Sequence, residues 1–383
     1  MASPKSSLIL ASPTDEERRR CWKATHPQWG AALSLDAYLA REQRQLEIPL
    51  ARNGGLTNWI LTTREGESVP PPAGGSTDTG RPVLSSCETL KKRALVRGKD
   101  GIIREGTAHG VASVFTDPAY RGRGYATTML RQLADTLGKM EEENRGDAMF
   151  SVLYSDVGKK FYAVNEWFPH PSNHAEFAAS VDDTPAVSPE ALKILHFDDL
   201  PPLVAADEQL IRKEIAQPPH PGHPAIRAAI LPDLDQIHWH LAREGFVCEQ
   251  LFSRRPNVHG ALYTSSSGAR VWAIWARSFS GTVAEPAKNT LFFLRFVVEE
   301  GVSDEDLREA LRAIVAVAKK EAADTACAKV QMWNPDRRVR AAAEELGAKY
   351  VVRDNDSITS LNALGEIRGE PVDWVANEKY AWC

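Results

Sequence analysis

Arginine and glycine alternate over residues 121–124 of this 383-residue sequence. The apolar run VASVF ends a few residues before this stretch, and the amphipathic stretch TTMLRQLADTL follows it. A turn that leads from a strand into a helix exposes unpaired backbone N–H groups at the positive end of the helix dipole. Gly122 and Gly124 allow a close approach of the backbone to a ligand, and Arg121 and Arg123 add donors that suit a pyrophosphate. We therefore expect an anion-binding turn here, with an ordinary exposed turn as the alternative.

Strand-like and helix-like segments alternate around this turn and must position it. Residues 56–63 and 83–98 have strand character. Thr14 and Ser34 stand where they can cap two helices that precede these strands. We expect a βαβα core over residues 107–168, within a mixed sheet that is flanked by helices.

The second half of the chain repeats this order of elements. TLFFLRFVVEE, a loop and a helical pattern are followed by the strand-like CAKVQMW and a further helix. The loop at 299–307, EEGVSDEDL, is acidic and would repel a phosphate. We interpret the second half as a degenerate copy of the first, one that keeps the fold and has lost the anion site. In the alternating run VWAIWARSF, Trp272 and Trp275 are expected in the core.

Composition excludes several classes of function. The net charge is −5, from 46 basic and 51 acidic residues, so no nucleic-acid or membrane partner is indicated. No apolar run approaches the length of a membrane span, and the N-terminus does not resemble a secretory signal. Five scattered cysteines without CxxC spacing indicate a reducing, cytoplasmic compartment. No metal site is expected, because His238 and His240 point apart at helical i, i+2 spacing and lack a recognisable third ligand.

The segment DPAYRGRGYATTML resembles the acetyl-CoA-binding motif of the GNAT superfamily of N-acetyltransferases, with Arg121, Gly124 and Ala126 at the signature positions. The Phe161–Tyr162 pair resembles the superfamily's next segment, although Glu166–Trp167 stands where Gly-Phe is usual. The remainder, with SSCET and the closing NEKYAWC, is similar to the fungal lysine acetyltransferase family, which acetylates the side-chain amine of free lysine.

The resemblance implies an α/β (α+β) GNAT fold and acetyl-CoA as cosubstrate, with no metal. The backbone of the strand at Val114, Phe115 and Thr116 would pair with the pantetheine arm. The pyrophosphate would be held by the turn and the start of the helix, which comprise Arg121, Gly122, Arg123, Gly124, Tyr125, Ala126 and Thr127.

The resemblance also implies direct attack of an amine on the thioester, which requires a base and benefits from an acid. Tyr162 stands where the superfamily places the acid, and its alternative role is an aromatic anchor for its helix. Glu88 lies on a strand that lines the acceptor cleft in GNAT folds, and it is either the base or a solvated residue paired with Lys91 or Lys92. His109 is a rival for the base, and its alternative is a local hydrogen bond in a loop.

The aromatic tail DWVANEKYAWC is expected to dock on the protein. By analogy with tandem GNAT-like enzymes, the Cys383 carboxylate or the rings of Tyr380 and Trp382 would help to build the acceptor pocket. The alternative is simple packing on the second domain.

These features predict a GNAT domain over residues 1–175, a linker over 176–190 and a GNAT-like domain over 191–383. The predicted function is acetyl transfer from acetyl-CoA to a small amine, with the side-chain amine of free L-lysine as the first choice. A polyamine or natural-product acetyltransferase and a non-catalytic acyl-CoA-binding protein are the alternatives. The oligomeric state is not indicated.

Overall fold

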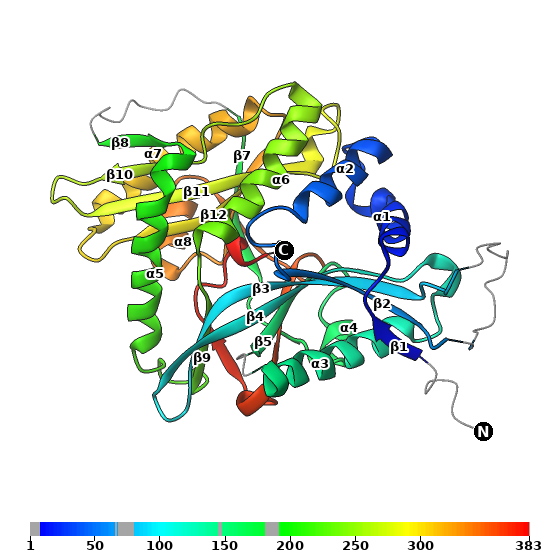
Figure 1. Cartoon of the computed structure of the whole chain (residues 1–383). Coiled ribbons are helices and arrows are strands. Elements are labelled where there is room, and N and C mark those ends of the chain that lie inside the picture. Colours follow the sequence, from blue (N-terminus) through cyan, green and yellow to red (C-terminus); the bar gives the residue numbers. More distant parts are fainter. Residues whose placement is uncertain (1–7, 66, 68–79, 145–147, 181–190, 383) are drawn as a thin grey trace.

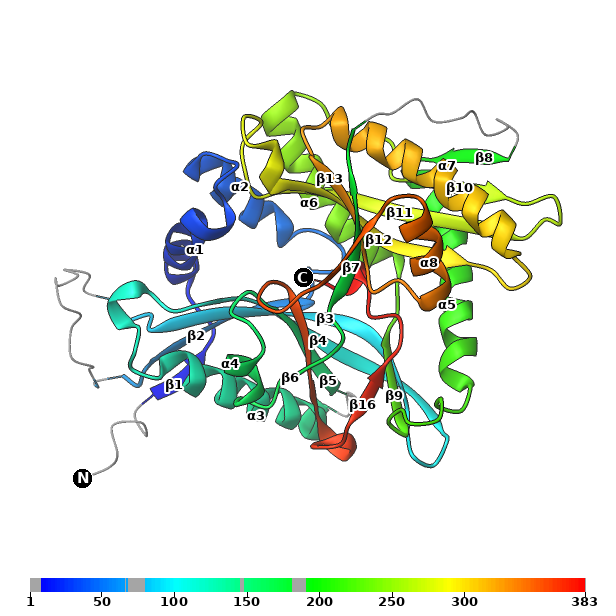
Figure 2. The ribbon, with the colours of Figure 1, turned by 180° about the vertical axis from the view of Figure 1, so that it is seen from behind.

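A computed structural model describes residues 8–65, 67, 80–144, 148–180 and 191–382. Two mixed sheets lie one above the other, each with helices on its outer face, and the described chain ends at the centre between them (Figures 1 and 2). The proline- and glycine-rich segment at 66–82, between the two strands predicted at 56–63 and 83–98, falls mostly outside the described residues.

The first sheet has the order β1-β2-β3-β4-β5-β15-β6, and β9 joins it at the far end of β3 and carries β16. Its pairs are antiparallel except for β4–β5 and β9–β16. The strands are β1 (Leu8–Ala11), β2 (Leu56–Thr63), β3 (Ser85–Arg97), β4 (Ile103–Phe115), β5 (Ala148–Ser155), β6 (Phe168–Pro169), β9 (Ile226–Ile230), β15 (Ile358–Ala363) and β16 (Val372–Trp374).

The second sheet has the order β14-β7-β13-β12-β11-β10-β8, and only its β12–β13 pair is parallel. The strands are β7 (Asn173–Ala178), β8 (Leu192–Leu195), β10 (Gly260–Thr264), β11 (Arg270–Phe279), β12 (Asn289–Val298), β13 (Lys329–Trp333) and β14 (Lys349–Val352).

Helices cover both sheets, and α2 packs on α6 where the two halves of the molecule meet. Thr14 and Ser34 cap α1 and α2 as predicted, and Thr14 forms a reciprocal capping box with Glu17. The α-helices are α1 (Asp15–Trp29), α2 (Leu35–Gln45), α3 (Tyr125–Asn144), α4 (Lys160–Ala163), α5 (Leu200–Ala216), α6 (Leu234–Phe252), α7 (Asp304–Ala323) and α8 (Arg337–Glu345).

The predicted internal repeat is confirmed by the topology. In the first half β4, α3, β5 and α4 follow one another, and β12, α7, β13 and α8 do so in the second. Each set builds its sheet's parallel pair of sequential strands with a helix as the crossover. Trp272 and Trp275 are fully buried, as expected. The second helix of the βαβα core predicted over residues 107–168 is only a single turn, α4, because the chain turns at Glu166, whose φ is 76°.

The two sheets exchange strands across the domain boundary predicted at 176–190. Strand β7 pairs with β13 and β14 of the second sheet, although its first half, residues 173–175, precedes the predicted boundary. Conversely, β15 inserts between β5 and β6 of the first sheet, and β9 extends β3. Each half thus completes the other's sheet, while the predicted linker lies mostly outside the described residues and the domain limits stay a prediction.

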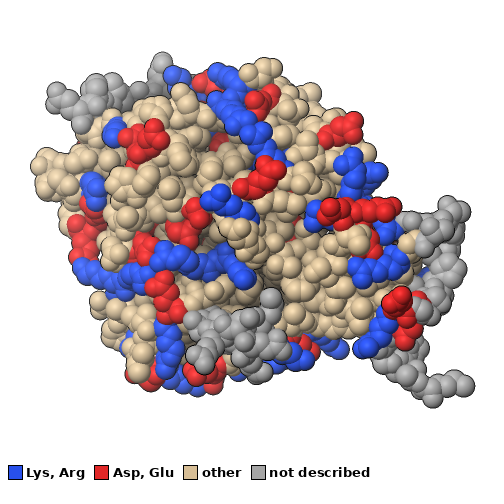
Figure 3. Space-filling view, in the orientation of Figure 1, with Lys and Arg blue, Asp and Glu red and all other residues tan. Residues whose placement is uncertain are grey.

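Ion pairs connect neighbouring elements at the surface. Figure 3 shows Lys and Arg interspersed with Asp and Glu over one face. Arg93 of β3 and Arg212 of α5 both bind Glu105 and Glu208, and this network attaches α5 to the first sheet. Among the described helices, none is long and apolar enough to cross a membrane.

Candidate active site

The first sheet opens between β4 and β5. Their parallel pairing ends at Gly110 and Val152, while β4 runs on to Phe115 and β5 to Ser155. Beyond Val152, β5 pairs on its other edge with β15. The edge of β4 that faces the gap therefore has backbone groups with no strand partner, and such groups can pair with an extended ligand.

A cavity of about 820 Å³ lies at this opening. Its lining comes from both halves of the chain: α1, α2, β3 and β4, the turn before α3, the end of β5, α4, and Trp239, Arg243 and Trp382. The predicted cofactor residues Val114, Phe115, Thr116, Arg121, Gly122, Gly124, Tyr125, Ala126 and Thr127 all line it, and so do Glu88 and Tyr162. The structure thus brings the predicted cofactor and acid–base residues to one place.

The turn at 121–124 leads directly into α3. Gly122 and Gly124 have φ of 76° and 79°, a left-handed conformation that favours glycine. Gly124 O accepts the first intrahelical bonds, from the amide and hydroxyl of Thr128. The N–H groups at the start of α3 precede the first intrahelical donors, so they are available to an anion.

The two arginines of the turn lie differently. Arg121 Nε donates to Thr116 O at 3.0 Å, and its guanidinium packs over Phe115, so it closes the turn against the end of β4. Arg123 is not part of the cavity lining, and it packs over the ring of Tyr120 on the outside of the turn. Of the two, Arg121 is the one placed toward a ligand in the cavity.

A β-bulge in β4 directs Ser113 toward Glu88. Two residues of β4 oppose Cys87 there, and Ser113 has a φ of 53°. Ser113 Oγ donates to Glu88 Oε1 at 2.6 Å, and Asn58 Nδ2 of β2 donates to Oε2 at 3.3 Å. Both carboxylate oxygens of Glu88 are therefore held at the cavity wall.

The environment of Glu88 adjusts its acidity. Burial, and then the nearby negative charge of Glu42, raise the pKa of Glu88 to about 7, against the opposing effect of the hydrogen bond from Ser113. A carboxylate whose pKa lies near neutrality is suited to accept a proton from an amine at physiological pH.

Tyr162 lies at the other side of the opening, on α4. Its side chain is 9% exposed, and its ring packs edge-on against Phe161. Burial raises the pKa of the Tyr162 phenol, so the group stays protonated at neutral pH and can donate a proton. Its position serves both predicted roles, since the ring anchors α4 while the residue lines the cavity.

His109 lies on the other face of the sheet. His109 lies opposite Lys91 of β3, so the two share a face of the sheet. Lys91 is three residues from Glu88 on the same strand, so the side chains of His109 and Glu88 point to opposite faces. Its ring is buried outside the cavity lining, and burial lowers its pKa to about 4. His109 is therefore not placed to act as the base.

The acceptor end of the cavity contains residues that were not predicted from the sequence. Arg243 of α6 lies between the rings of Trp239 and Trp382, 6.0 Å from each, and donates to Gln45 Oε1 at 3.2 Å. Burial, and then the neighbouring Arg41, lower its pKa to about 10, which leaves it charged at neutral pH. The only sequence signal was a Trp and an Arg four residues apart in the apolar helix pattern WHLAREG.

Helix α2 contributes an ion pair to the acceptor end of the cavity. Arg41 Nε donates to Glu42 Oε1 at 2.9 Å, and the Arg41 guanidinium lies 4.6 Å from the ring of Tyr38. These three residues line the cavity together with Arg243. The acceptor end thus offers a fixed cation beside a carboxylate.

The C-terminal tail reaches the cavity through Trp382. The tail is held at Tyr380, whose carbonyl accepts from Gln236 Nε2 at 2.8 Å and lies 2.9 Å from His240 Nε2. Tyr380 itself is fully buried away from the cavity, and its hydroxyl donates to Ile230 O at 2.5 Å. Cys383, the predicted catalytic carboxylate, lies outside the described residues.

No three His, Cys, Asp or Glu side chains in the described part of the chain are grouped as a metal site would require. His238 and His240 point apart on α6, as expected from their spacing, since His240 is buried against the tail and His238 packs on Phe197.

Comparisons with known proteins agree with this architecture. Residues 174–383 match the family model described as the LYC1 GNAT-like C-terminal domain. A lysine acetyltransferase of Yarrowia lipolytica is 24% identical, over 98% of this chain and 99% of the relative. An uncharacterised protein of Saccharomyces cerevisiae is 21% identical, over 100% and 99%.

Two solved structures share the fold at low sequence identity. A probable N-acyltransferase of Enterococcus faecalis, described as a conserved protein of unknown function, superposes with a TM-score of 0.56 at 11% identity, covering 94% of this chain and 72% of that one. A GCN5-related N-acetyltransferase of Kribbella flavida gives 0.51 at 14% identity, covering 93% and 71%.

The family model spans more than half of the chain, the fungal relatives align over its whole length, and the sheets have the predicted GNAT arrangement with a degenerate second copy. The chain therefore belongs to the family of the LYC1 GNAT-like C-terminal domain, and its fold is that of the GNAT N-acetyltransferases.

Proposed function

We propose that this chain transfers the acetyl group of acetyl-CoA to the side-chain amine of free L-lysine, by direct attack of the amine on the thioester. Family membership makes it a GNAT-type N-acetyltransferase. The observation that carries the finer proposal is that Glu88, Tyr162 and Arg243 line a single cavity together with Arg121, Gly122 and Gly124 of the turn. The cytoplasmic location expected from the cysteines stays a prediction.

The residues present fit acetyl-CoA. In our proposal the unpaired edge of β4 at Val114, Phe115 and Thr116 holds the pantetheine arm, which carries amide groups that can pair with a strand. Arg121 and the amides that begin α3 hold the pyrophosphate. Bound there, acetyl-CoA supplies the activated acyl group, and every proton transfer falls to the chain's own residues.

Glu88 is the proposed base. The side-chain ammonium of lysine has a pKa near ~10.4 and is almost wholly protonated at neutral pH, so it must lose a proton before it can attack. The Glu88 carboxylate accepts that proton, directly or through water. Tyr162, which its raised pKa keeps protonated at neutral pH, then donates its phenolic proton to the leaving thiolate.

The acceptor end supports an amino acid rather than a polyamine. Arg243 is a buried cation in the cavity wall and would bind the α-carboxylate of lysine, while Glu42 would attract its α-ammonium group. A polyamine has no carboxylate and would leave the Arg243 charge unpaired beside further positive charge. Trp239 and Trp382 supply apolar walls for the aliphatic chain.

A matched pair of acceptors tests this assignment. L-Lysine and 1,5-diaminopentane carry the same terminal amine, and only lysine carries the carboxylate. We expect kcat/KM to favour lysine in the wild type by roughly 10- to 100-fold, the range for one charge-assisted hydrogen-bonded pair. Arg243→Gln should remove most of that preference by raising KM for lysine alone.

Arg254→Gln is the matched control, because Arg254 lies outside the cavity lining and donates to Asp324 O. Equal kcat/KM for the two amines in the wild type would contradict the carboxylate role of Arg243. Binding of acetyl-CoA without turnover on lysine, polyamines, amino sugars or peptides would favour a non-catalytic acyl-CoA-binding protein instead.

A further inference from the structure

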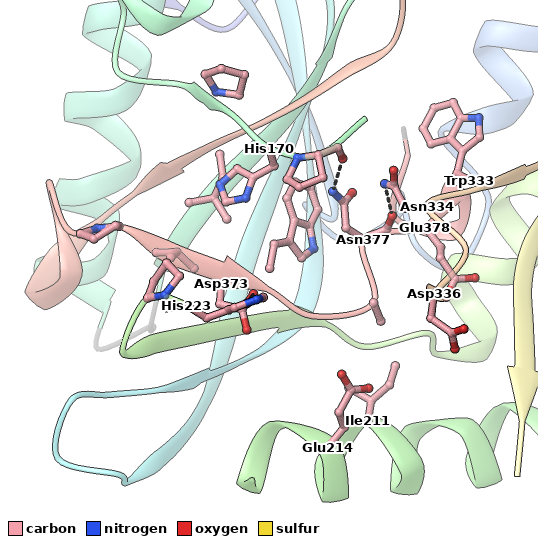
Figure 4. Close-up of a pocket in the computed structure, with 18 of the residues that line it drawn as sticks. His170, Ile211, Glu214, His223, Trp333, Asn334, Asp336, Asp373, Asn377 and Glu378 are labelled. Atoms are coloured by element: carbon pink, nitrogen blue, oxygen red, sulfur yellow. Dashed lines mark hydrogen bonds and ion pairs between the residues drawn. The ribbon is translucent and has the colours of Figure 1, made fainter. Parts of the chain in front are cut away.

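A second and larger cavity, of about 1,110 Å³, lies where the two sheets meet, away from the acetyl-transfer site. Its walls come from β6, α5, β12, the loop from β13 to α8, and β15 to the tail. Figure 4 shows this cavity with α5 below it, β16 on one side and the start of α8 on the other. No step of the proposed acetyl transfer uses it.

Carboxylates surround its mouth. Glu214 projects from α5 toward the space between Asp373 of β16 and Asp336 at the start of α8 (Figure 4). Asp373 binds Arg227 at 3.0 Å and lies 3.2 Å from His223, and Glu214 lies 3.6 Å from the same arginine. Asp336 caps α8 by accepting from Val339 N, and its side chain is exposed.

The positive charges in the lining are already engaged. Arg295, which is 6% exposed, is held bidentately by Asp207 and also binds Glu378. Arg368, the other arginine of the lining, pairs with Glu166 at 3.0 Å. Burial lowers the pKa of His170 to about 4, so this lining residue is neutral. The lining contains seven carboxylates and two arginines, and Arg227 outside it pairs with Asp373 and Glu214, so the carboxylates outnumber the cations around the cavity.

The inner wall presents a buried acceptor without a donor. Asn377 is 8% exposed and lines the cavity, and its Nδ2 donates to Pro171 O and Thr359 Oγ1 at 3.1 Å. Its Oδ1 is buried and has no hydrogen-bond partner among the described residues. A buried amide oxygen in this state is costly unless a ligand or water donates to it.

Aromatic faces complete the wall. Trp333 and Trp374 line the cavity, and both contact the ring of Tyr154, at 5.8 Å and 6.3 Å between centroids. Tyr154 in turn lines the first cavity, so these three rings separate the two spaces. Indole faces attract organic cations as well as aliphatic chains.

We propose that this cavity is a second binding site, for a small aliphatic ammonium compound such as a diamine or a basic amino acid. The ammonium group binds among Glu214, Asp336 and Asn377, and the aliphatic part packs on Trp374, since Arg353 and Lys379 already contact the Trp333 ring. The site does not depend on the proposed acetyl transfer, since it shares no lining residue with the cavity of Glu88 and Tyr162.

Equilibrium dialysis with radiolabelled 1,5-diaminopentane tests the site without any turnover. The test variant is E214Q/D336N, which removes two charges at exposed positions and keeps an asparagine that can still cap α8. We expect it to weaken binding by about tenfold or more, as for the loss of charge-assisted hydrogen bonds, with acetyl-transfer kinetics unchanged. Radiolabelled L-lysine is tested in parallel, because the buried Trp374 Nε1 has no acceptor among the described residues and can bind a carboxylate oxygen.

Two controls separate this site from the first cavity. E345Q/E366Q removes the same charge from residues outside both cavity linings and should bind as the wild type does. Arg243→Gln alters only the first cavity and should retain the diamine binding that E214Q/D336N loses. Absence of diamine binding to the wild type, or equal binding by the wild type and E214Q/D336N, would overturn the proposal.

Discussion

Replacing Glu88 by glutamine should remove the base while leaving the shape of the cavity intact. Glutamine can still accept a hydrogen bond from Ser113 but cannot take a proton from the amine. A positioned general base contributes typically about 10²- to 10⁴-fold to the rate. We therefore expect kcat/KM for lysine to fall by roughly that factor, with little change in the affinity for acetyl-CoA.

The pH profile gives the sharper test. Glu88 acts only when ionised, and burial raises its pKa to about 7. Wild-type kcat/KM should therefore fall about tenfold per pH unit below this value and be level above it, until another group titrates. In Glu88→Gln this acid limb near pH 7 should be absent.

Ser113→Ala should shift the acid limb of the pH profile of kcat/KM rather than abolish it. The hydrogen bond from Ser113 favours the ionised form of Glu88, so its loss should raise the pKa of Glu88 further. A hydrogen bond of ordinary strength corresponds to about 0.5–1 pH unit. Ser85→Ala is the control, because the Ser85 hydroxyl contacts Thr116 instead.

Stability measurements show whether the variant is folded. The pKa of Glu88 is raised from 4.5, so ionising it destabilises the folded protein as pH rises from 4.5 to about 7. Glu88→Gln should match the wild-type Tm at low pH and exceed it at about pH 8. A Glu88→Gln variant that keeps the acid limb and loses less than about tenfold in rate would refute the assignment of the base.

Three further variants test other parts of the account. Tyr162→Phe should lower kcat by about 10²-fold with little change in KM, measured by thiol release, and unchanged kcat would rule out the acid. Gly124→Ala should strain the turn by about 1–2 kcal/mol and weaken acetyl-CoA binding in calorimetry, whereas Gly138→Ala, in open space on the same helix, should not. Glu244→Gln removes the charge of a fully buried partner of Arg277, which keeps its ion pair with Glu321, and should destabilise the fold by about 1–3 kcal/mol in denaturant titration; a loss under ~0.5 kcal/mol, the scale of an exposed pair, would contradict this.

Local signals in the sequence accounted for much of the architecture. The caps at Thr14 and Ser34, the strand at 56–63 and the strand–turn–helix around Gly124 each depend on neighbouring residues, and the structure contains them all. The internal repeat was predicted because the two halves of the chain have the same order of strands and helices although their residues differ. The turn was predicted because its two positions of positive φ, 122 and 124, are both glycine, and this residue type can be read directly from the sequence.

Contacts between residues far apart in the chain could not be predicted from local sequence patterns. The insertion of β15 between β5 and β6 depends on pairing between strands that are far apart in the chain. Arg243 reaches the cavity because α2 packs on α6, a contact without a local pattern, whereas Trp382, on the tail anchored by Gln236 and His240, was expected there only by analogy with tandem GNAT-like enzymes. The face occupied by His109 follows from the register of β3 with β4, which pairs His109 with Lys91 and which alternation within one strand does not determine.

The central claim is acetyl transfer to the side-chain amine of lysine, and one assay tests it directly. Purified protein is incubated with acetyl-CoA and L-lysine, thiol release is followed, and the position of the acetyl group on the product is determined by NMR. We predict thiol release that depends on lysine, with the acetyl group on the side-chain nitrogen. No lysine-dependent release by protein that binds acetyl-CoA, or acetylation of the α-amine alone, would contradict the account.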